Sequence, residues 1–206
     1  MRQKRRYANC LRSARIIYLG WRIEKMKKVL ILSGSPRKGG NSDVLCDEFA
    51  KGALDAGNEV EKIRVVEKKI TPCTGCYYCR THGGECAFRD DMAELLQKII
   101  DCDVLVLSSP VYFYSVCAQL KTVIDRTVAR WREIANKELY YIATAAETDE
   151  DTLDTTLACF HGFAKCIDGY EEKGTLYGKG VYEKGEVQNR PELMTIAYEM
   201  GLSVHE

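Results

Sequence analysis

The fold class follows from residues 28–42, whose sequence is Lys28-Val29-Leu30-Ile31-Leu32-Ser33-Gly34-Ser35-Pro36-Arg37-Lys38-Gly39-Gly40-Asn41-Ser42. Residues 29–32 form a continuous apolar run, which is typical of a strand buried on both faces of a parallel sheet. The run passes into a loop rich in glycine and hydroxyl groups, and a helix is predicted from about Ser42 to Ala56, ending at Gly57. A buried strand, a glycine-rich loop and a helix in this order indicate the first unit of an α/β fold.

The rest of the chain repeats this alternation of strand and helix. Further strands are predicted near residues 60–66, 104–107, 139–143 and 174–182, and further helices begin near Asp90, Val116, Leu153 and Pro191. Five strands alternating with helices predict a parallel sheet with helices on both faces. Right-handed crossovers with one reversal of direction favour the strand order 2-1-3-4-5, a flavodoxin-like three-layer α/β sandwich. In such a sheet a ligand binds at the carboxyl ends of the first and third strands.

Composition narrows the class of protein. The chain has 206 residues, 30 of them basic and 30 acidic, and its 46% of hydrophobic residues is enough for one soluble domain with a real core. No uncharged apolar run approaches the roughly 18 residues that a membrane span needs, so we expect no membrane partner. The ten cysteines do not resemble the disulfide framework of a small secreted protein, because four of them crowd into one short stretch. We therefore expect a cytoplasmic protein.

The charges are unevenly distributed. Residues 1–26 hold eight basic residues and one acidic residue, so the remainder of the chain is acidic, which argues against nucleic acid as a partner of the folded domain. The pattern changes at Met26, and we expect residues 1–26 to be a basic extension outside the fold and residues 27–206 to form one domain. On this interpretation Met26 is the true first residue, and residues 1–25 are a start-site artefact or a loose tail. The alternative is an amphipathic arm for a membrane or a nucleic acid.

The loop after the first strand has the chemistry of a phosphate site. A helix amino terminus presents unpaired N–H groups and partial positive charge. Ser35, Asn41 and Ser42 can donate hydrogen bonds to phosphate oxygens, and Arg37 can add a charged fork. The loop lacks a Walker A motif, since Gly40 and Asn41 stand where Lys and Ser/Thr are required, and it has no G-x-G-x-x-G. A single terminal phosphate, as on FMN, fits best, and the alternative is an ordinary Gly/Pro turn.

The loop after the third strand has the chemistry of a wall for a flat ring. Its sequence is Ser108-Ser109-Pro110-Val111-Tyr112-Phe113-Tyr114-Ser115, and three aromatic side chains at the carboxyl end of a strand are poorly explained as core. Aromatic faces and a backbone fixed by Pro110 could form the wall of a flat isoalloxazine ring, while backbone N–H groups contact its polar edge. Thr144 and Ala145, after the fourth strand, are candidates for its other edge. The alternative interpretation is an aromatic interface between subunits, and both interpretations are compatible.

A cysteine-rich loop is predicted at residues 72–89. Cys73, Cys76, Cys79 and Cys86 give the spacing C-x2-C-x2-C-x6-C. Three thiolates at three-residue spacing can bind the corners of a [4Fe–4S] cluster, with a more distant fourth ligand completing the set. Structural zinc more often uses two separated pairs. Three alternatives remain open, namely a [4Fe–4S] cluster, zinc, and free or redox-active thiols.

The predicted ligand loops carry a set of short motifs, namely Gly34-Ser35-Pro36-Arg37 with Gly40-Asn41-Ser42, Asp90-Asp91-Met92, Ser109-Pro110-Val111-Tyr112, Gln119-Leu120-Lys121 and Ile124-Asp125-Arg126. This set closely resembles the NAD(P)H-dependent FMN reductase family, and with the cysteine loop it resembles the iron–sulfur flavoprotein branch. The resemblance covers about residues 28–200 and is strongest over 28–126. It implies a flavodoxin-like fold, bound FMN, and a homodimer or homotetramer. By family position Ser35, Arg37, Asn41 and Ser42 would hold the phosphate, and Pro110, Val111, Tyr112 and Phe113 would lie along the flavin.

The resulting hypothesis is an FMN-dependent oxidoreductase that takes hydride from NAD(P)H and passes electrons to a small-molecule or protein acceptor. A [4Fe–4S] cluster in the cysteine loop is a candidate relay. The cofactor supplies the chemistry, so no general acid or base is assigned. The competing hypothesis is a flavodoxin-like redox-sensing or binding module, with zinc or redox-active thiols in the same loop.

Overall fold

The computed structural model describes residues 26–205, and the expectations for residues 1–25 lie outside these described residues. Its sheet has the strand order β2-β1-β3-β5-β6, with the short strand β4 paired to β3 alone. The elements in chain order are β1 Lys28–Ser33, α1 Asn41–Asp55, β2 Glu59–Arg64, η1 Val65–Glu67, α2 Tyr78–Thr81, α3 Met92–Asp101, β3 Val104–Tyr112, β4 Ser115–Val116, α4 Ala118–Arg126, η2 Thr127–Ala129, η3 Trp131–Glu133, β5 Glu138–Thr144, η4 Glu150–Leu153, α5 Asp154–Ala164, β6 Glu171–Gly178, η5 Glu186–Asn189, α6 Pro191–Leu202 and η6 Ser203–His205.

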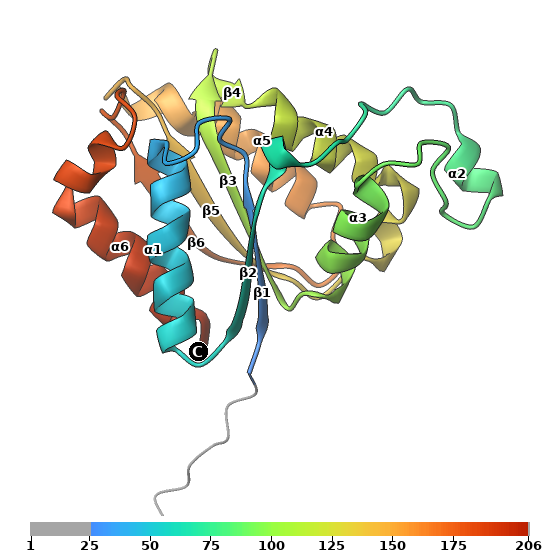
Figure 1. Ribbon diagram of the computed structural model, residues 1–206, viewed down its shortest axis with the longest axis horizontal. Coiled ribbons are helices and arrows are strands. Elements are labelled where there is room, and N and C mark those ends of the chain that lie inside the picture. Colours follow the sequence, from blue (N-terminus) through green and yellow to red (C-terminus); the bar gives the residue numbers. More distant parts are fainter. Residues whose placement is uncertain (1–25, 206) are drawn as a thin grey trace, which may run out of the picture.

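The sheet confirms the predicted flavodoxin-like class. Its five long strands pair in parallel, and their order in the sheet corresponds to 2-1-3-4-5 along the chain. Helices α1 and α6 cover one face and α3, α4 and α5 cover the other (Figure 1). Since the direction of winding reverses between β1 and β3, the carboxyl ends of these two strands border an open crevice at the top of the sheet.

The central strands are buried on both faces, as their unbroken apolar runs predict. In β1, Leu30 and Leu32 pack into the core under α3, α4 and α5, whereas Val29 and Ile31 pack into the core under α1 and α6. All four are at most 2% exposed. This alternation follows from the two-residue period of a strand.

Helix α1 is held against α6 by two glycines. An added Cβ at Gly52 would lie 2.0 Å from the Tyr198 carbonyl oxygen, and one at Gly201 would lie 2.0 Å from the Phe49 carbonyl oxygen. Only glycine permits this close approach of the two backbones. The contact fixes the position of α1, whose amino end borders the crevice.

Two predicted boundaries differ from the structure. The segment 108–115 is not a loop, because β3 continues to Tyr112 and turns back into β4. Ser109 and Pro110 stay in register with Ala143 and Thr144 of β5, so the neighbouring strand keeps this segment extended. The last strand is β6, Glu171–Gly178, and begins before the predicted 174–182, because pairing with β5 extends it over polar residues that lack an apolar signal.

The cysteine-rich segment 72–89 is largely irregular, as predicted, and contains one short helix, α2. Figure 1 shows α2 standing away from the sheet, beyond α3. Among residues 26–205, none of the helices combines the length and the apolar character that crossing a membrane requires.

Candidate functional site

A crevice of about 490 Å³ opens at the carboxyl ends of β1, β3 and β5. Its size is within the range of small-molecule sites. All ten side chains predicted from sequence to bind the flavin cofactor line it: Ser35, Arg37, Asn41, Ser42, Pro110, Val111, Tyr112, Phe113, Thr144 and Ala145. Three segments that are distant in sequence therefore meet at one site because the topology of the sheet brings their ends together.

The floor of the crevice at β1 is shaped for an anion. Gly40 precedes α1 and provides no side-chain cap for the helix, so the first N–H groups of α1 remain without an intrahelical acceptor. An added Cβ at Gly40 would lie 2.8 Å from the Ser35 hydroxyl, so the loop is as tight as its glycines allow. The Ser42 hydroxyl is buried and has no hydrogen-bond partner. A phosphate group fits this arrangement because it supplies the acceptor that these donors lack.

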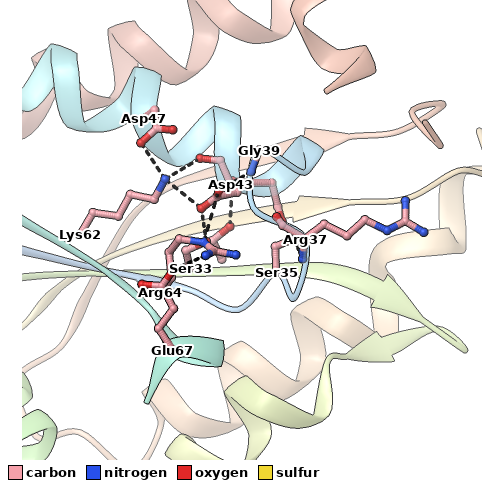
Figure 2. A network of polar contacts seen from close by, with 11 residues as sticks. Ser33, Ser35, Arg37, Gly39, Asp43, Asp47, Lys62, Arg64 and Glu67 are labelled. Atoms are coloured by element: carbon pink, nitrogen blue, oxygen red, sulfur yellow. Dashed lines mark hydrogen bonds and ion pairs between the residues drawn. The ribbon is translucent and has the colours of Figure 1, made fainter. Parts of the chain in front are cut away.

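The loop is fixed from behind by the carboxylate of Asp43, which the sequence analysis did not single out (Figure 2). Asp43 accepts hydrogen bonds from the Ser33 hydroxyl, 2.8 Å away, and from the Gly39 N–H, 2.9 Å away. Gly39 has a positive φ of 67°, so its N–H reaches Asp43 through a left-handed turn. Asp43 itself is 2% exposed. Its carboxylate thus joins the end of β1, the loop and the first turn of α1.

Two cations from β2 balance this buried charge. Lys62 Nζ lies 2.8 Å from Asp43 Oδ1 and 2.6 Å from the exposed carboxylate of Asp47, and Arg64 Nε lies 3.5 Å from Asp43 Oδ2 (Figure 2). Burial alone would raise the pKa of the Asp43 carboxyl, but the hydrogen bonds from Lys62, Gly39 and Ser33 outweigh burial and hold this pKa below its ordinary value. Asp43 therefore stays ionised, and its negative charge is compensated within the protein by Lys62 and Arg64.

Asn41 and Arg37 hold the neighbouring wall of the crevice. The Asn41 side chain donates to the Glu183 carbonyl oxygen at 3.0 Å and accepts from the Val187 N–H at 3.1 Å. Arg37 Nη1 lies 3.3 Å from the Tyr182 carbonyl oxygen. Both contacts hold the segment after β6 beside the loop after β1. The amide of Asn41 is thus already bonded to the protein, whereas the Ser42 hydroxyl is not.

The opposite wall ends in a strained hairpin. Val111 pairs with Val116 and Tyr112 with Ser115, which leaves Phe113 and Tyr114 as a two-residue turn. Both have positive φ values, 49° and 58°, the conformation of a type I′ turn that favours Asn-Gly. Holding non-glycine residues there costs about 1–2 kcal/mol each. Phe113 is fully exposed at the tip, so burial in the chain does not offset that strain.

Two residues that sequence reasoning missed also line the crevice. Thr152 is 1% exposed and its hydroxyl has no hydrogen-bond partner, and Tyr182 contributes an exposed ring from the segment after β6. No local motif marks Thr152, because only the fold brings η4 to the end of β5. Asp43 did offer a signal, namely an acidic side chain in the first turn of the helix after a glycine-rich loop.

The four clustered cysteines face a second cavity, of about 750 Å³. Cys73, Cys76, Cys79 and Cys86 all line it, and all are free thiols. In the part of the chain that the structure describes, no three His, Cys, Asp or Glu side chains are arranged to hold a single metal ion. Thiolates are soft ligands of the kind that iron–sulfur clusters and zinc both use.

One thiol of this cavity is activated. A hydrogen bond from the Tyr78 N–H, at the start of α2, is the largest influence on Cys76 and holds the pKa of its thiol below the ordinary value. A lower pKa favours the thiolate, which is the form that binds metals. Helix α2 is itself stabilised by Tyr78, whose ring stacks on His82 with 3.6 Å between centroids. The cavity thus combines four thiols with a local structure that promotes ionisation of one of them.

The chain is similar to proteins of known class. The family model described as NADPH-dependent FMN reductase matches residues 27–163. An iron-sulfur flavoprotein of Archaeoglobus fulgidus is 50% identical over 101 residues, which are 49% of this chain and 45% of that protein. An iron-sulfur flavoprotein of Methanocaldococcus jannaschii is 36% identical over 138 residues, which are 66% of this chain and 70% of that protein. The matched region spans about half the length of most of these curated relatives.

The architecture is shared with a solved NAD(P)H:quinone oxidoreductase from Methanothermobacter marburgensis. The TM-score is 0.68 at 18% identity, and the likeness covers 88% of this chain and 98% of that chain. This likeness concerns the fold, whereas the sequence matches concern the family. On the strength of those matches, the chain belongs to the NADPH-dependent FMN reductase family, in its iron–sulfur flavoprotein branch.

Proposed function

We propose that this protein is an FMN-dependent oxidoreductase that takes electrons from NAD(P)H and passes them to an acceptor, with a [4Fe–4S] cluster in the cysteine loop. The observation that carries the FMN assignment is the buried Ser42 hydroxyl without a partner, set beside the uncapped start of α1 in the crevice. Such a donor-rich, otherwise unsatisfied site is built for an anionic group.

The phosphate end of FMN is assigned to the loop after β1. Ser35 and Ser42 provide hydroxyl donors and Arg37 provides a charged fork on the exposed side. Asn41 acts mainly by holding the segment around Glu183 and Val187 in place, as its bonds at 3.0 and 3.1 Å indicate. Asp43 would hold the loop in this shape before phosphate binds, through its bonds to Ser33 and Gly39.

The ring end is assigned to β3 and β5. Pro110, Val111 and Tyr112 belong to an extended strand and present one wall, with Phe113 at the hairpin tip, and Thr144 and Ala145 present the opposite edge. Bound FMN supplies the redox chemistry of the site, accepting hydride from NAD(P)H and returning electrons to an acceptor. The residues of these two strands would hold and orient the ring.

The cluster assignment rests on the thiols and on the relatives. Cys73, Cys76, Cys79 and Cys86 line one cavity, and several similar proteins are described as iron-sulfur flavoproteins. We further propose a homodimer or homotetramer in the cytoplasm, where reduced thiols persist. The lowered pKa of Cys76 supports one alternative, an FMN enzyme with redox-active thiols and no iron.

The reductase assignment is tested by anaerobic reduction. Purified protein is mixed with NADH or NADPH, and absorption is followed at the flavin band. We expect the protein to contain one flavin per chain, and we expect this flavin band to bleach with at least one of the two donors. Protein that contains flavin and bleaches with neither donor would exclude the reductase, although it could still exchange electrons with another carrier.

The cluster assignment is tested by analysis of protein purified without oxygen. We expect iron and acid-labile sulfide in equal amounts, together with flavin, and a yellow-brown colour. Flavin without iron supports the thiol alternative, and zinc without flavin supports a binding module. Light scattering on the same sample tests the oligomer, and a monomer would contradict that part of the proposal.

A further inference from the structure

The cysteine loop joins the body of the protein through a narrow neck made of residues 69–71 and 90–92. The Lys69 N–H donates to Asp91 Oδ2 at 2.7 Å, and the Asp91 N–H donates back to the Lys69 carbonyl oxygen at 3.1 Å. The Thr71 N–H donates to Asp90 Oδ2 at 2.9 Å, and the Met92 N–H donates to Asp90 Oδ1 at 3.2 Å. Two adjacent aspartates thus bring the two ends of the loop together.

Arg126, the last residue of α4, fastens this neck to the body. Its guanidinium donates to both carboxylate oxygens of Asp90, at 2.8 and 3.0 Å, and also to the Thr71 carbonyl oxygen. Arg126 is 2% exposed. One buried side chain therefore contacts both the segment that enters the loop, at Thr71, and the segment that leaves it, at Asp90. Contacting both segments at once requires the several donors of a planar guanidinium. A lysine ammonium cannot replace it in this role.

The same guanidinium reaches the wall of the cysteine cavity. Arg126 lines that cavity together with the four cysteines. It lies over the Phe88 ring, 5.2 Å from the centroid, and Phe88 follows Cys86 by two positions on the wall of the same cavity. Arg80, Arg130 and Arg132 also line the cavity, but the hydrogen bonds of Arg130 go to Glu133 and Gln97, away from the neck.

We propose that Arg126 is the positioning residue of the cluster site: it closes the cysteine loop at its neck and places a buried positive charge beside Cys86, the remote fourth ligand. This inference rests on the proposed cluster. Four thiolates give such a cluster net negative charge, and hydrogen bonds and charges near the sulfurs set its reduction potential. Arg126 therefore governs both retention of the cluster and its potential.

The experiment compares three variants after anaerobic reconstitution with iron and sulfide. Arg126→Gln removes the charge and the fork, Arg126→Lys keeps the charge alone, and Arg130→Gln is the matched control, which removes a charge from the same cavity without touching the neck. Iron and sulfide per FMN are measured, and the cluster potential is determined by titration. These readouts do not depend on turnover.

We expect Arg126→Gln to bind FMN normally, to retain less than half of the wild-type iron, and to hold its remaining cluster at a lower potential. Arg126→Lys should recover the potential but not the iron content, and Arg130→Gln should keep wild-type iron. Wild-type iron and potential in Arg126→Gln would overturn the proposal. So would an Arg130→Gln variant that loses as much iron as Arg126→Gln.

A second variant separates a local role from a role in folding. Asp90→Asn keeps the Arg126 charge but weakens the neck, and we expect it to lose iron while it retains FMN and the wild-type circular dichroism spectrum. Loss of FMN and of folded structure in both Arg126→Gln and Asp90→Asn would overturn the local role, because the pair would then support the whole domain. A wild-type protein that takes up no iron and sulfide is a different result, which refutes the cluster itself.

Discussion

The loop after β1 and the cysteine loop are both candidate cofactor sites, yet they are built in opposite ways. The loop after β1 is short, lies over the sheet and is fastened from behind by Asp43, which is almost completely buried. The cysteine loop spans residues 72–89, stands away from the sheet and has Cys73 and Cys76 exposed. The first is fixed along its length by the core, whereas the second is fixed mainly at its neck.

This difference indicates how each site depends on its ligand. A loop whose buried charges are already paired and whose turns are already formed without ligand is preorganised. Binding a ligand there does not have to offset the entropy cost of ordering the loop. A loop with few buried apolar contacts opens at low free energy and gains order from what it binds. We therefore expect FMN to bind independently of iron, and iron to determine the order of residues 72–89.

The largest expected effect separates the two sites. Cys76→Ser removes a thiolate, which is the form that ligates iron, so we expect iron and sulfide to fall to background. FMN content should stay within about twofold of wild type, because an independent site elsewhere on the fold is unaffected. Elemental analysis and flavin absorption of the same sample measure both. As a control, Cys166→Ser, an exposed thiol outside the cavity, should change neither quantity.

Next in size is the effect of Arg37→Ala on FMN. One charge-assisted contact to phosphate contributes about 1.5–3 kcal/mol, so the dissociation constant for FMN should rise about 10- to 150-fold. Flavin fluorescence quenching on titration of the apoprotein measures it. Lys38→Ala is the neighbouring control, and loss of this exposed charge should change the affinity for FMN by no more than about twofold. Equal effects of the two substitutions would exclude a specific role for Arg37.

Asp43→Asn tests whether the phosphate loop is preorganised by its buried network. The substitution leaves Lys62 with one carboxylate partner, Asp47, and we expect the free energy of unfolding to fall by about 2 kcal/mol. Chemical denaturation of the apoprotein measures it. Asp47→Asn removes the other, largely exposed partner of the same lysine and should cost less than about 0.5 kcal/mol. A larger loss in the Asp47 variant would contradict the importance given to the buried pair.

The network also predicts a dependence on pH. Because the pKa of Asp43 is lowered in the folded protein, its contribution to stability is present above the ordinary carboxyl pKa, near 3.8, and is lost as pH falls through the lower folded value. The free energy of unfolding should therefore decline more steeply below about pH 4 in wild type than in Asp43→Asn. Parallel curves for the two proteins would show that Asp43 titrates normally.

The smallest expected effect concerns the hairpin tip. Replacing Phe113 and Tyr114 by Asn and Gly supplies the residues that a type I′ turn favours, so the apoprotein should gain about 1 kcal/mol in unfolding free energy. FMN affinity should fall, since the proposed contact between Phe113 and the ring would be lost. Thermal denaturation and FMN titration of the double variant measure these two changes. A lower melting temperature would mean that the aromatic tip stabilises the free protein instead of straining it.

Local sequence pattern was sufficient for the parallel sheet and, together with the family resemblance, for ten of the residues that line the crevice. The apolar runs at residues 29–32 and 104–107 identify buried strands, and the fold rules place their ends together. Local pattern was not sufficient where pairing with a neighbouring strand determines the secondary structure. Ser109 and Pro110 have the composition of a loop, but pairing with β5 keeps them in a strand.

The remaining site residues depend on tertiary contacts that no motif encodes. Asp43 is recognisable only once Lys62 and Arg64 from β2 are seen beside it. Arg126 is part of a motif, but its function as a link between Thr71 and Asp90 follows from side chains more than 30 positions apart. Thr152 lines the crevice because the fold places η4 beside the end of β5.

The most direct test of a preorganised FMN site is an equilibrium titration of iron-free protein with FMN and with riboflavin, followed by flavin fluorescence. We expect saturation at one FMN per chain, and riboflavin, which lacks the phosphate, should bind at least about tenfold more weakly. Absence of saturable FMN binding without iron, or equal affinity for the two flavins, would contradict an anion site prepared in advance at the start of α1.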